Sequence, residues 1–550
     1  MIEPINHYSI KNVPTVFDEE ALTVLELVGR LTGKTNEIIH LLLKHDIDIG
    51  GLGTSIKNID NHMTGIAETL GELVVEPLGF ATPQMFGATG DGVADDTQAI
   101  KAAIQSLSNH NAVLYFPPGT YLVTEDIDLK SNITVKGSGE ASVIRRAGNV
   151  LTHYRVFRCV NVSNVHICDL SIHGDKDQHM GSSGEWGMCV SLEGTRNVSI
   201  DRCWLMNGWG DGVYIGVADE TGGPYCQHIT IRDSKIVGNR RNGISVISVD
   251  GLTIDGCLIS TTKGTLPEAG IDFEPNLADQ VVKNVRISNT TFTGNANDVL
   301  FADTENNLYF TKQVIFTGCA FNSKSGLDWR TPLTQMDGSL NPESYVRFVG
   351  CEFRNSHRCV RVTKGDWDTL VTFSGCDFSC DSIAIEIGES GRDYNGGTLG
   401  GLCFLDCRVH ANGSTNPVVR GVGSNASFAK ITADLHADKA IRGYGYFSGA
   451  NSDIHLDFHE GIYQVSVSTT FDKYKIPSTI YVPATATEGY MMTFDSSFPR
   501  GQVVRIIRDT TASVGVMNTN ADSAVVPEGV SYFMLTPSGK VSVIGGIGQL

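Results

Sequence analysis

A six-residue unit recurs through the middle of the chain and constrains its fold more than any other feature. The unit consists of an apolar residue, two residues of any kind, a small residue, one residue of any kind and a second apolar residue. Its first copy is IDRCWL, ending at Leu205, and its last is FLDCRV, ending at Val409. Successive copies lie 23 to 33 residues apart. Glycine and asparagine, which favour turns, separate the short strand-like segments. The small position is occupied by Cys203, Ser234, Cys257, Thr290, Cys319, Cys351, Cys376 and Cys407.

A variable period near 30 residues, built of short strands, predicts a parallel β-helix in which each repeat forms one coil. The small residue of each unit then points inward and stacks on its equivalent in the next coil, about 4.8 Å away. Six of the thirteen cysteines would form this interior column and behave as small apolar residues. They do not form the CxxC pairs that are typical of metal sites, and we expect neither a metal nor another cofactor.

Two regions of different pattern flank the repeats. Residues 1–80 read as helical, and from Ile56 to Leu73 the apolar residues alternate steps of three and four, a heptad seam that favours a three-stranded coiled coil. A short amphipathic helix packed on its own domain is the alternative. We expect residues 81–470 to form the β-helix. The longer alternating strands of residues 471–550 predict a β-sandwich, which caps the β-helix or serves as a binding tip.

Charge and the N-terminal sequence argue against several classes of partner. The 42 basic and 61 acidic residues give a net charge of −19 without a dense basic run, which disfavours a nucleic acid or an anionic membrane surface. No stretch approaches the roughly 20 apolar residues that a membrane helix requires. The N-terminus MIEPINHYSIK lacks the pattern of a secretory signal, so we expect folding in a cytoplasm with reduced thiols.

The segment FGATGDGVADDTQAIKAAI, from Phe86 to Ile104, together with LYFPPGTYLV ending at Val123, resembles the opening signature of the pectate-lyase-like superfamily. The resemblance implies a right-handed, single-stranded parallel β-helix whose N-terminal end is covered by a short helix. Either Asp95 or Asp96 can cap that helix. The residues that would cover the first coil are Ile100, Ala103 and Ile104.

The whole arrangement, a helical N-terminus, a three-stranded seam, a β-helix and a terminal β-sandwich, resembles that of bacteriophage tailspikes. The opening PINHYSIKNVPTVFDEEALTVLELVGR is similar, more loosely, to the virion-attachment end of tail appendages from phages of Gram-positive bacteria. The resemblance implies a homotrimer that is made in the host cytoplasm and joins the phage tail or collar through its N-terminal region. It also implies recognition of a bacterial surface polysaccharide or teichoic acid.

A pair of carboxylates on one predicted strand is the sharpest chemical signal. In EAGIDFEPN, alternation turns Ile271 and Phe273 inward and turns Asp272 and Glu274 outward, with Cα atoms of one face roughly 6.6 to 6.8 Å apart. Glycosidic hydrolysis needs two carboxylates about 5 to 9.5 Å apart. Aligning the coils by their glycines places Asp211 two coils away, roughly 9 to 10 Å from Asp272. These three acids are the candidate catalytic set.

Neighbouring positions supply candidate contacts to a substrate. Tyr214 and Ser245 fall in the same exposed column as Asp272, and Trp186 can stack on a sugar ring. The adjacent arginines 240 and 241 can bind an anionic group such as a uronate or a phosphate. Exposed carboxylates on a solenoid are most often only solvated, which is the competing interpretation. The candidate substrate-binding residues are Trp186, Tyr214, Arg240, Arg241 and Ser245.

These candidates fit more than one activity. We expect a glycan depolymerase in which one of Asp272 and Glu274 protonates the leaving oxygen while the other, or Asp211, activates water. A polysaccharide lyase would instead use Arg240 or Lys263 as the base of a β-elimination, with a bound cation for which no dense acidic site stands out. Cleavage of teichoic acid phosphodiesters and a receptor-binding fibre without enzymatic activity are further alternatives, because a fold does not fix its chemistry.

Overall fold

The computed structural model describes residues 79–459, apart from residues 108–110, 219–222, 278, 303–310, 331–342, 364–370, 395–397, 412–418, 438–445 and 448–449, together with strands between residues 463 and 547. Almost all of the predicted helical region, including its heptad seam, lies outside the described residues. The three-stranded coiled coil therefore stays a prediction.

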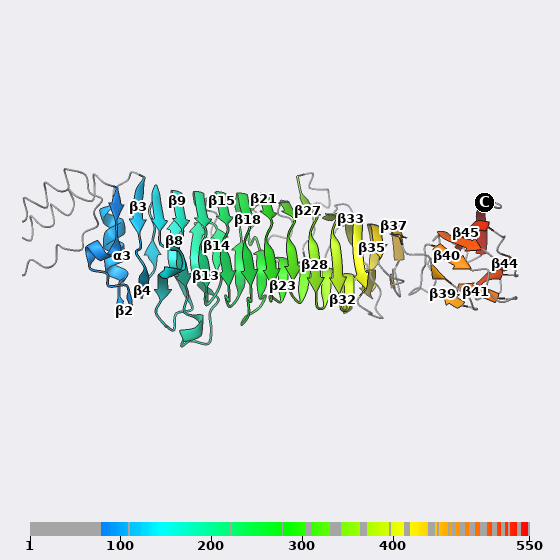
Figure 1. Ribbon diagram of the computed structural model, residues 1–550, viewed down its shortest axis with the longest axis horizontal. Helices are drawn as coiled ribbons and strands as arrows, with labels where there is room; N and C mark the ends of the chain where they lie inside the picture. Colours follow the sequence, from blue (N-terminus) through cyan, green and yellow to red (C-terminus); the bar gives the residue numbers. More distant parts are fainter. Residues whose placement is uncertain are drawn as a thin grey trace, which may run out of the picture. The chain divides into compact units, whose positions relative to one another are not determined.

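Short parallel strands form three stacks, and successive coils of the chain add strands to each stack (Figure 1). The predicted mainly β fold, a parallel β-helix, is confirmed. The first stack consists of β3 (Ala112–Tyr115), β6 (Ile133–Lys136), β9 (Ser163–Cys168), β12 (Arg196–Asp201), β15 (Cys226–Arg232), β18 (Val249–Asp255), β21 (Val282–Ser288), β24 (Lys312–Thr317), β27 (Tyr345–Val349), β30 (Val371–Ser374), β33 (Thr398–Ala411), β35 (Ser427–Ala437) and β37 (Ala450–His459).

The second stack joins the first through the long strand β33, and the third stack is a separate sheet. The second stack consists of β2 (Asp91–Asp95), β4 (Gly119–Val123), β7 (Ser142–Arg146), β10 (Ser171–His173), β13 (Trp204–Met206), β16 (Lys235–Val237), β19 (Leu258–Ser260), β22 (Thr291–Thr293), β25 (Ala320–Asn322), β28 (Glu352–Asn355) and β31 (Asp377–Cys380). The third stack consists of β5 (Ile127–Asp128), β8 (His153–Val160), β11 (Trp186–Glu193), β14 (Val213–Gly216), β17 (Asn242–Val246), β20 (Ala269–Phe273), β23 (Asn297–Phe301), β26 (Ser325–Trp329), β29 (Arg358–Val362), β32 (Ile383–Asp393), β34 (Val419–Ser424) and β36 (Tyr446–Phe447).

The small residues of the repeat unit fill the interior, as predicted, and all eight are between 0% and 3% exposed. Seven of them lie at the turn between a first-stack strand and a second-stack strand, and Cys407 lies within the long strand β33. The backbone N–H of Cys203 donates to Ser234 Oγ of the next coil at 3.0 Å. Further along, the thiol of Cys351 contacts the thiols of Cys319 and Cys376 on either side. No cysteine forms a disulfide, so packing and these short contacts hold the column together.

Two columns of phenylalanine extend the core along the later coils. Phe316, Phe348, Phe373 and Phe404 stack face to face with centroid distances of 4.6, 4.8 and 4.6 Å. This column uses the first apolar position of the repeat unit. The last apolar position supplies a second column, which meets the first edge to face. Aromatic pairs in these geometries stabilise a core beyond simple burial.

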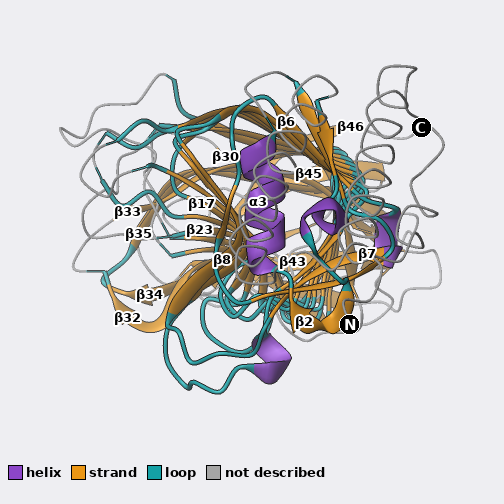
Figure 2. Ribbon diagram, turned by 90° about the vertical axis from the view of Figure 1, so that its left-hand side faces the viewer, coloured by secondary structure: helices purple, strands orange, loops and turns teal. Residues whose placement is uncertain are grey.

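The helix α3 (Thr97–Ser106) lies across the N-terminal end of the stacks (Figure 2). Its first N–H, that of Thr97, donates to Asp95 Oδ1 at 3.0 Å, whereas the carboxylate of Asp96 accepts the N–H of Thr89. The residues predicted to cover the first coil, Ile100, Ala103 and Ile104, are all buried. Among the described residues α3 is the longest helix, and its ten residues are too few to cross a membrane.

Two further sheets lie near the C-terminus. One combines parallel and antiparallel pairs and consists of β38 (Tyr463–Gln464), β40 (Thr479–Val482), β42 (Val503–Arg508), β45 (Gly529–Leu535) and β46 (Val541–Ile547). The other consists of β39 (Thr469–Phe471), β41 (Tyr490–Phe494), β43 (Val514–Asn518) and β44 (Ser523–Val525). Their assembly into a β-sandwich stays a prediction. The remaining short elements are β1 (Phe80–Ala81) and the 3-10 helices at Pro83–Phe86, Gly139–Ala141 and Lys176–Gln178.

Candidate active site

The third stack carries the candidate site, and its register agrees with the predicted alignment of the coils. Tyr214 in β14 pairs with Ser245 in β17, and Ser245 pairs with Asp272 in β20. Asp272 in turn pairs with Leu300 in β23. Asn242, three residues before Ser245 in β17, pairs with Ala269, the first residue of β20. The β-helix therefore brings together acids that are far apart in the sequence.

The prediction that this column is exposed is wrong. Asp211, Ser245 and Asp272 are each 0% exposed, whereas the side chain of Glu274 is 25% exposed. Arg241 contributes to the low exposure of these groups. Its side chain is itself only 12% exposed and lies against Ser245, Asp211 and Glu274. Its Nη1 is 3.3 Å from Ser245 Oγ and 3.6 Å from Asp211 Oδ2. Arg241 thus contacts protein groups in this structure, and its predicted contact with a substrate stays a prediction.

Arg241 gathers carboxylates from several coils. Its Nη2 donates to Glu274 Oε2 at 2.7 Å, and its Nε lies 3.4 Å from Glu185 Oε2. Burial lowers the pKa of Arg241, but the charges of Asp211, Glu274 and Asp272 outweigh burial and raise it. Four carboxylates thus surround one guanidinium, and the cluster is short of positive charge.

Asn242 connects two of these acids through hydrogen bonds. Its backbone N–H donates to Asp211 Oδ1 at 3.1 Å, and its Nδ2 donates to Asp272 Oδ2 at 3.1 Å and to Ser245 Oγ at 2.9 Å. Among the described residues, Asp272 Oδ1 has no hydrogen-bond partner. One oxygen of this buried carboxyl is therefore available to carry a proton or to meet a ligand.

Burial shifts the pKa of both central acids upward. Burial raises the pKa of Asp211 to about 6, although Arg241 opposes the shift. Burial also raises the pKa of Asp272 well above its ordinary value, and the charges of Glu274 and Asp211 raise it further. A carboxyl whose pKa is raised by burial, beside a second carboxyl paired with an arginine, is an arrangement that can supply a general acid and a general base.

The other candidate residues surround this cluster with different degrees of exposure. Trp186 is 52% exposed and directly follows Glu185, so its indole is open to a ligand. Arg240 stacks on the ring of Trp209 at 3.9 Å and donates to the carbonyl oxygen of Gly184 at 2.7 Å. Tyr214 is partly buried in the column beside Ser245. Trp186 and Tyr214 therefore remain the aromatic candidates, while Arg240 is engaged with protein groups.

Asp328 and Trp329 lie in strand β26 of the third stack. Trp329 is 1% exposed and packs on Phe301 inside the β-helix at 4.5 Å, in line with Phe273. Asp328 follows Leu300 in the outer column. The sequence carried a signal for this strand, because Gly326 in SGLDW takes the same register position as Gly243 and Gly270. Within the described part of the chain, no group of three or more histidine, cysteine, aspartate or glutamate side chains is placed to hold a metal.

Two family models match this chain. Residues 84–176 match a model described as rhamnogalacturonase A/epimerase, pectate lyase-like, and residues 188–379 match a model described as right handed beta helix region. Both segments fall within the three stacks. The matches confirm the resemblance that the opening signature indicates and identify the β-helix as right-handed.

Curated and solved proteins add partial similarities. YclG of Bacillus subtilis (strain 168), an uncharacterized protein, is 30% identical over 239 residues, which cover 38% of this chain and 41% of that protein. The pre-neck appendage protein of Bacillus phage B103 is 24% identical over 278 residues, which cover 44% of this chain and 32% of that protein. This chain thus matches less than half the length of either relative. A solved tailspike, gp49 of Acinetobacter baumannii bacteriophage Fri1, is 12% identical with a TM-score of 0.43, covering 70% of this chain and 64% of that one.

Proposed function

We propose that this right-handed, pectate-lyase-like β-helix is a phage tail appendage that binds a bacterial surface glycan and depolymerises it by acid and base hydrolysis. The similarity to a phage pre-neck appendage protein supports the placement in a virion. A polysaccharide or a wall teichoic acid is the proposed substrate. The homotrimer and the attachment through residues 1–80 remain predictions of the sequence.

One observation carries the enzymatic part of the proposal. Asp211, Asp272 and Glu274 come from separate coils or strand positions and converge on Arg241 and Asn242. In the proposed reaction Asp272, whose pKa is raised by burial, protonates the leaving oxygen. Glu274, the more exposed of the two, activates water, while the charges of Glu274 and Asp211 add to the upward shift that burial gives the pKa of Asp272.

Access to Asp272 requires a rearrangement of the side chains that cover it. Arg241 is the side chain that would move, because its guanidinium contacts both the partly exposed Glu185 and Glu274 and the buried Asp211. A glycan bearing a carboxylate or phosphate would attract the guanidinium outward. Trp186, at the rim, would hold the adjoining sugar ring.

A receptor-binding appendage without enzymatic activity is the second candidate. The observation that favours it is the complete burial of Asp211 and Asp272 within hydrogen bonds and ion pairs. Networks of this kind also occur for purely structural reasons. Binding would then involve the exposed rim around Trp186, and the acids would only join neighbouring coils.

Incubation with purified host glycans separates the two candidates. Size-exclusion chromatography should show shortened polysaccharide or teichoic acid with the native chain. The Asp272→Asn and Glu274→Gln variants should bind the glycan and leave its length unchanged. An Asp169→Asn variant, which alters an exposed ion pair with Arg202, is the matched control and should retain cleavage. Intact glycan with the native chain would favour the adhesin, and products that absorb in the ultraviolet would indicate β-elimination.

A further inference from the structure

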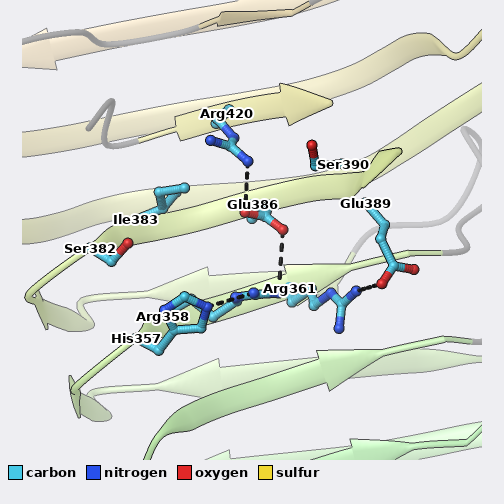
Figure 3. Close-up of a pocket in the computed structure, with 9 residues that line it drawn as sticks. All are labelled: His357, Arg358, Arg361, Ser382, Ile383, Glu386, Glu389, Ser390 and Arg420. Carbon is cyan, nitrogen blue, oxygen red and sulfur yellow. Dashed lines mark hydrogen bonds and ion pairs between the residues drawn. The ribbon is translucent and has the colours of Figure 1, made fainter. Parts of the chain in front are cut away.

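A pocket of about 330 Å³ opens on the third stack, several coils from the cluster at Arg241 (Figure 3). Its lining residues come from β29 and β32, with one from β34, and from the turns before β29 and β32. The register pairs Arg361 with Glu386 and Glu386 with Arg420, so opposite charges alternate across three coils. The volume falls at the lower end of the roughly 300 to 1,000 Å³ of small-molecule sites.

Guanidinium groups dominate this pocket. Glu386, whose side chain is 6% exposed, lies between Arg358 Nη1 at 3.3 Å and Arg420 Nη2 at 3.4 Å. Arg361 reaches the carboxylate of Glu389 on the other side, as the dashed lines of Figure 3 show. The three arginine side chains are 17% to 25% exposed. Each is therefore fixed by protein contacts and still meets solvent.

The positive charges outnumber the negative ones in this network. Among the described residues, its ion pairs join three carboxylates to five guanidinium groups, which is an excess of two positive charges within this set in a chain of net charge −19. Burial lowers the pKa of His357 at the pocket edge, and the charges of Arg358 and Lys324 lower it further. The carboxylates are Asp328, Glu386 and Glu389, and the arginines are Arg330, Arg358, Arg361, Arg392 and Arg420.

We propose that this pocket binds an anionic group of the glycan, the carboxylate of a uronic acid or a phosphate, as a second binding site on the third stack. The planar donors of arginine match both groups. The inference rests on the proposed function, because it takes the ligand to be part of the same glycan. Asp272 and Arg361 occupy one column, three coil spacings or roughly 14 Å apart, so a short oligosaccharide along the stack spans both sites.

Titration calorimetry of the full chain with three probes tests this inference. The probes are an oligogalacturonate, a poly(glycerol phosphate) and a neutral cello-oligosaccharide. We expect one of the anionic probes to bind, and Arg361→Gln and Arg420→Gln each to weaken that binding by at least tenfold. Arg347→Gln removes the same charge from an exposed position in β27 of the first stack, and it should leave the affinity within twofold. Melting temperatures show which variants fold. Because Arg361 and Arg420 are replaced separately, the test still gives a result if one of the two variants does not fold.

The pattern of binding identifies the ligand or overturns the proposal. Binding of the galacturonate alone assigns a carboxylate, and binding of the phosphate polymer alone assigns a phosphate. Failure of both anionic probes, equal binding of the neutral probe, or an equal loss in Arg347→Gln overturns the inference.

The same variants separate this inference from the proposed hydrolysis. If Asp272→Asn binds the anionic probe through Arg361 while the native chain shortens no glycan, the pocket stands and the hydrolysis does not. If the native chain shortens a glycan and Arg361→Gln does so with the same dependence on glycan concentration, the hydrolysis stands and the pocket does not.

Discussion

Arg241 on one coil donates a 2.7 Å hydrogen bond from Nη2 to Oε2 of Glu274 on the next coil. The same guanidinium also reaches Asp211, so Arg241 connects the partly exposed Glu274 to the buried Asp211. A single side chain thereby neutralises acids from separate coils and covers them from solvent.

Replacing Arg241 by methionine should destabilise the protein strongly. The change leaves Asp211 and Asp272 buried without their counter-charge, which typically costs about 3 to 5 kcal/mol. Arg202→Met removes an exposed arginine paired with Asp169 and should cost at most about 1 kcal/mol. Denaturant unfolding of both variants measures the difference. Equal losses would show that Arg241 is only a surface ion-pair partner.

The pH profile of glycan cleavage should respond to Asp211. The negative charge of Asp211 raises the pKa of Asp272, so Asp211→Asn should lower that pKa. Because the proposed acid must be protonated, the alkaline limb of the profile should move to lower pH in the variant. The profile of Asp169→Asn serves as the control and should match the native one. A limb that stays in place, or moves to higher pH, contradicts the role assigned to Asp272.

The thiols should be inert in the folded protein. Twelve of the thirteen cysteines are buried, and Cys403 is partly exposed. Burial raises the pKa of Cys203 to about 12 and that of Cys257 to about 11, which further suppresses the reactive thiolate. Ellman's reagent should therefore titrate at most about one thiol per chain before unfolding, and all thirteen in guanidinium chloride. Rapid reaction of several thiols in the native state would refute the interior column.

Truncating one ring of the phenylalanine column should weaken the β-helix. Phe348 stacks on Phe316 at 4.6 Å and on Phe373 at 4.8 Å and is fully buried. Phe348→Ala should cost about 3 to 5 kcal/mol through lost burial and a residual cavity. Phe348→Leu fills most of that space and should cost clearly less. Urea unfolding compares the two, and similar costs would mean that the rings are not closely packed.

Asp298 should make the stability depend on pH. Its buried carboxylate accepts hydrogen bonds from Ser323 N at 3.1 Å and from Nδ2 of Asn295 and Asn355. Burial nevertheless raises its pKa to about 7, so the folded state binds a proton more tightly than the unfolded state. The resulting stabilisation is complete below about pH 4 and is lost as the pH rises through about 7.

Calorimetry from pH 5 to pH 8 measures this contribution. The melting temperature of the native chain should fall more steeply over this range than that of Asp298→Asn, whose side chain does not titrate. The variant is expected to be less stable at low pH, because its amide cannot accept all the hydrogen bonds that Asp298 receives. Parallel curves for the two proteins would contradict the assignment.

Much of the fold could be predicted because a β-helix converts sequence period into spatial columns. The small position of the repeat predicts the buried run from Cys203 to Cys407, and its apolar ends predict the phenylalanine columns. The same logic aligns Tyr214 with Ser245 and Asp272. The sequence predicts which positions share a column, because side chains alternate along each strand and each repeat forms one coil.

The pocket around Arg361 escaped the sequence analysis although a signal existed. Continuing the column of Asp272 past Leu300 leads to Arg361, Glu386 and Arg420. The alignment by glycines ends at the coil of Leu300, where Asp298 takes the position of Gly243 and Gly270, although Gly326 of β26 returns to that position. Counting coils by strand pairing, rather than by a turn residue, would have reached these arginines.

The repeat in the chain determined which residues lie above one another, because the backbone of every coil must pair with its neighbours. Only the tertiary structure decided that Asp211 and Asp272 are closed off by Arg241 and that surplus arginines border an open pocket. Backbone pairing is periodic and can be read along the chain, whereas the exposure and charge balance of a long side chain depend on every group that the completed fold places beside it.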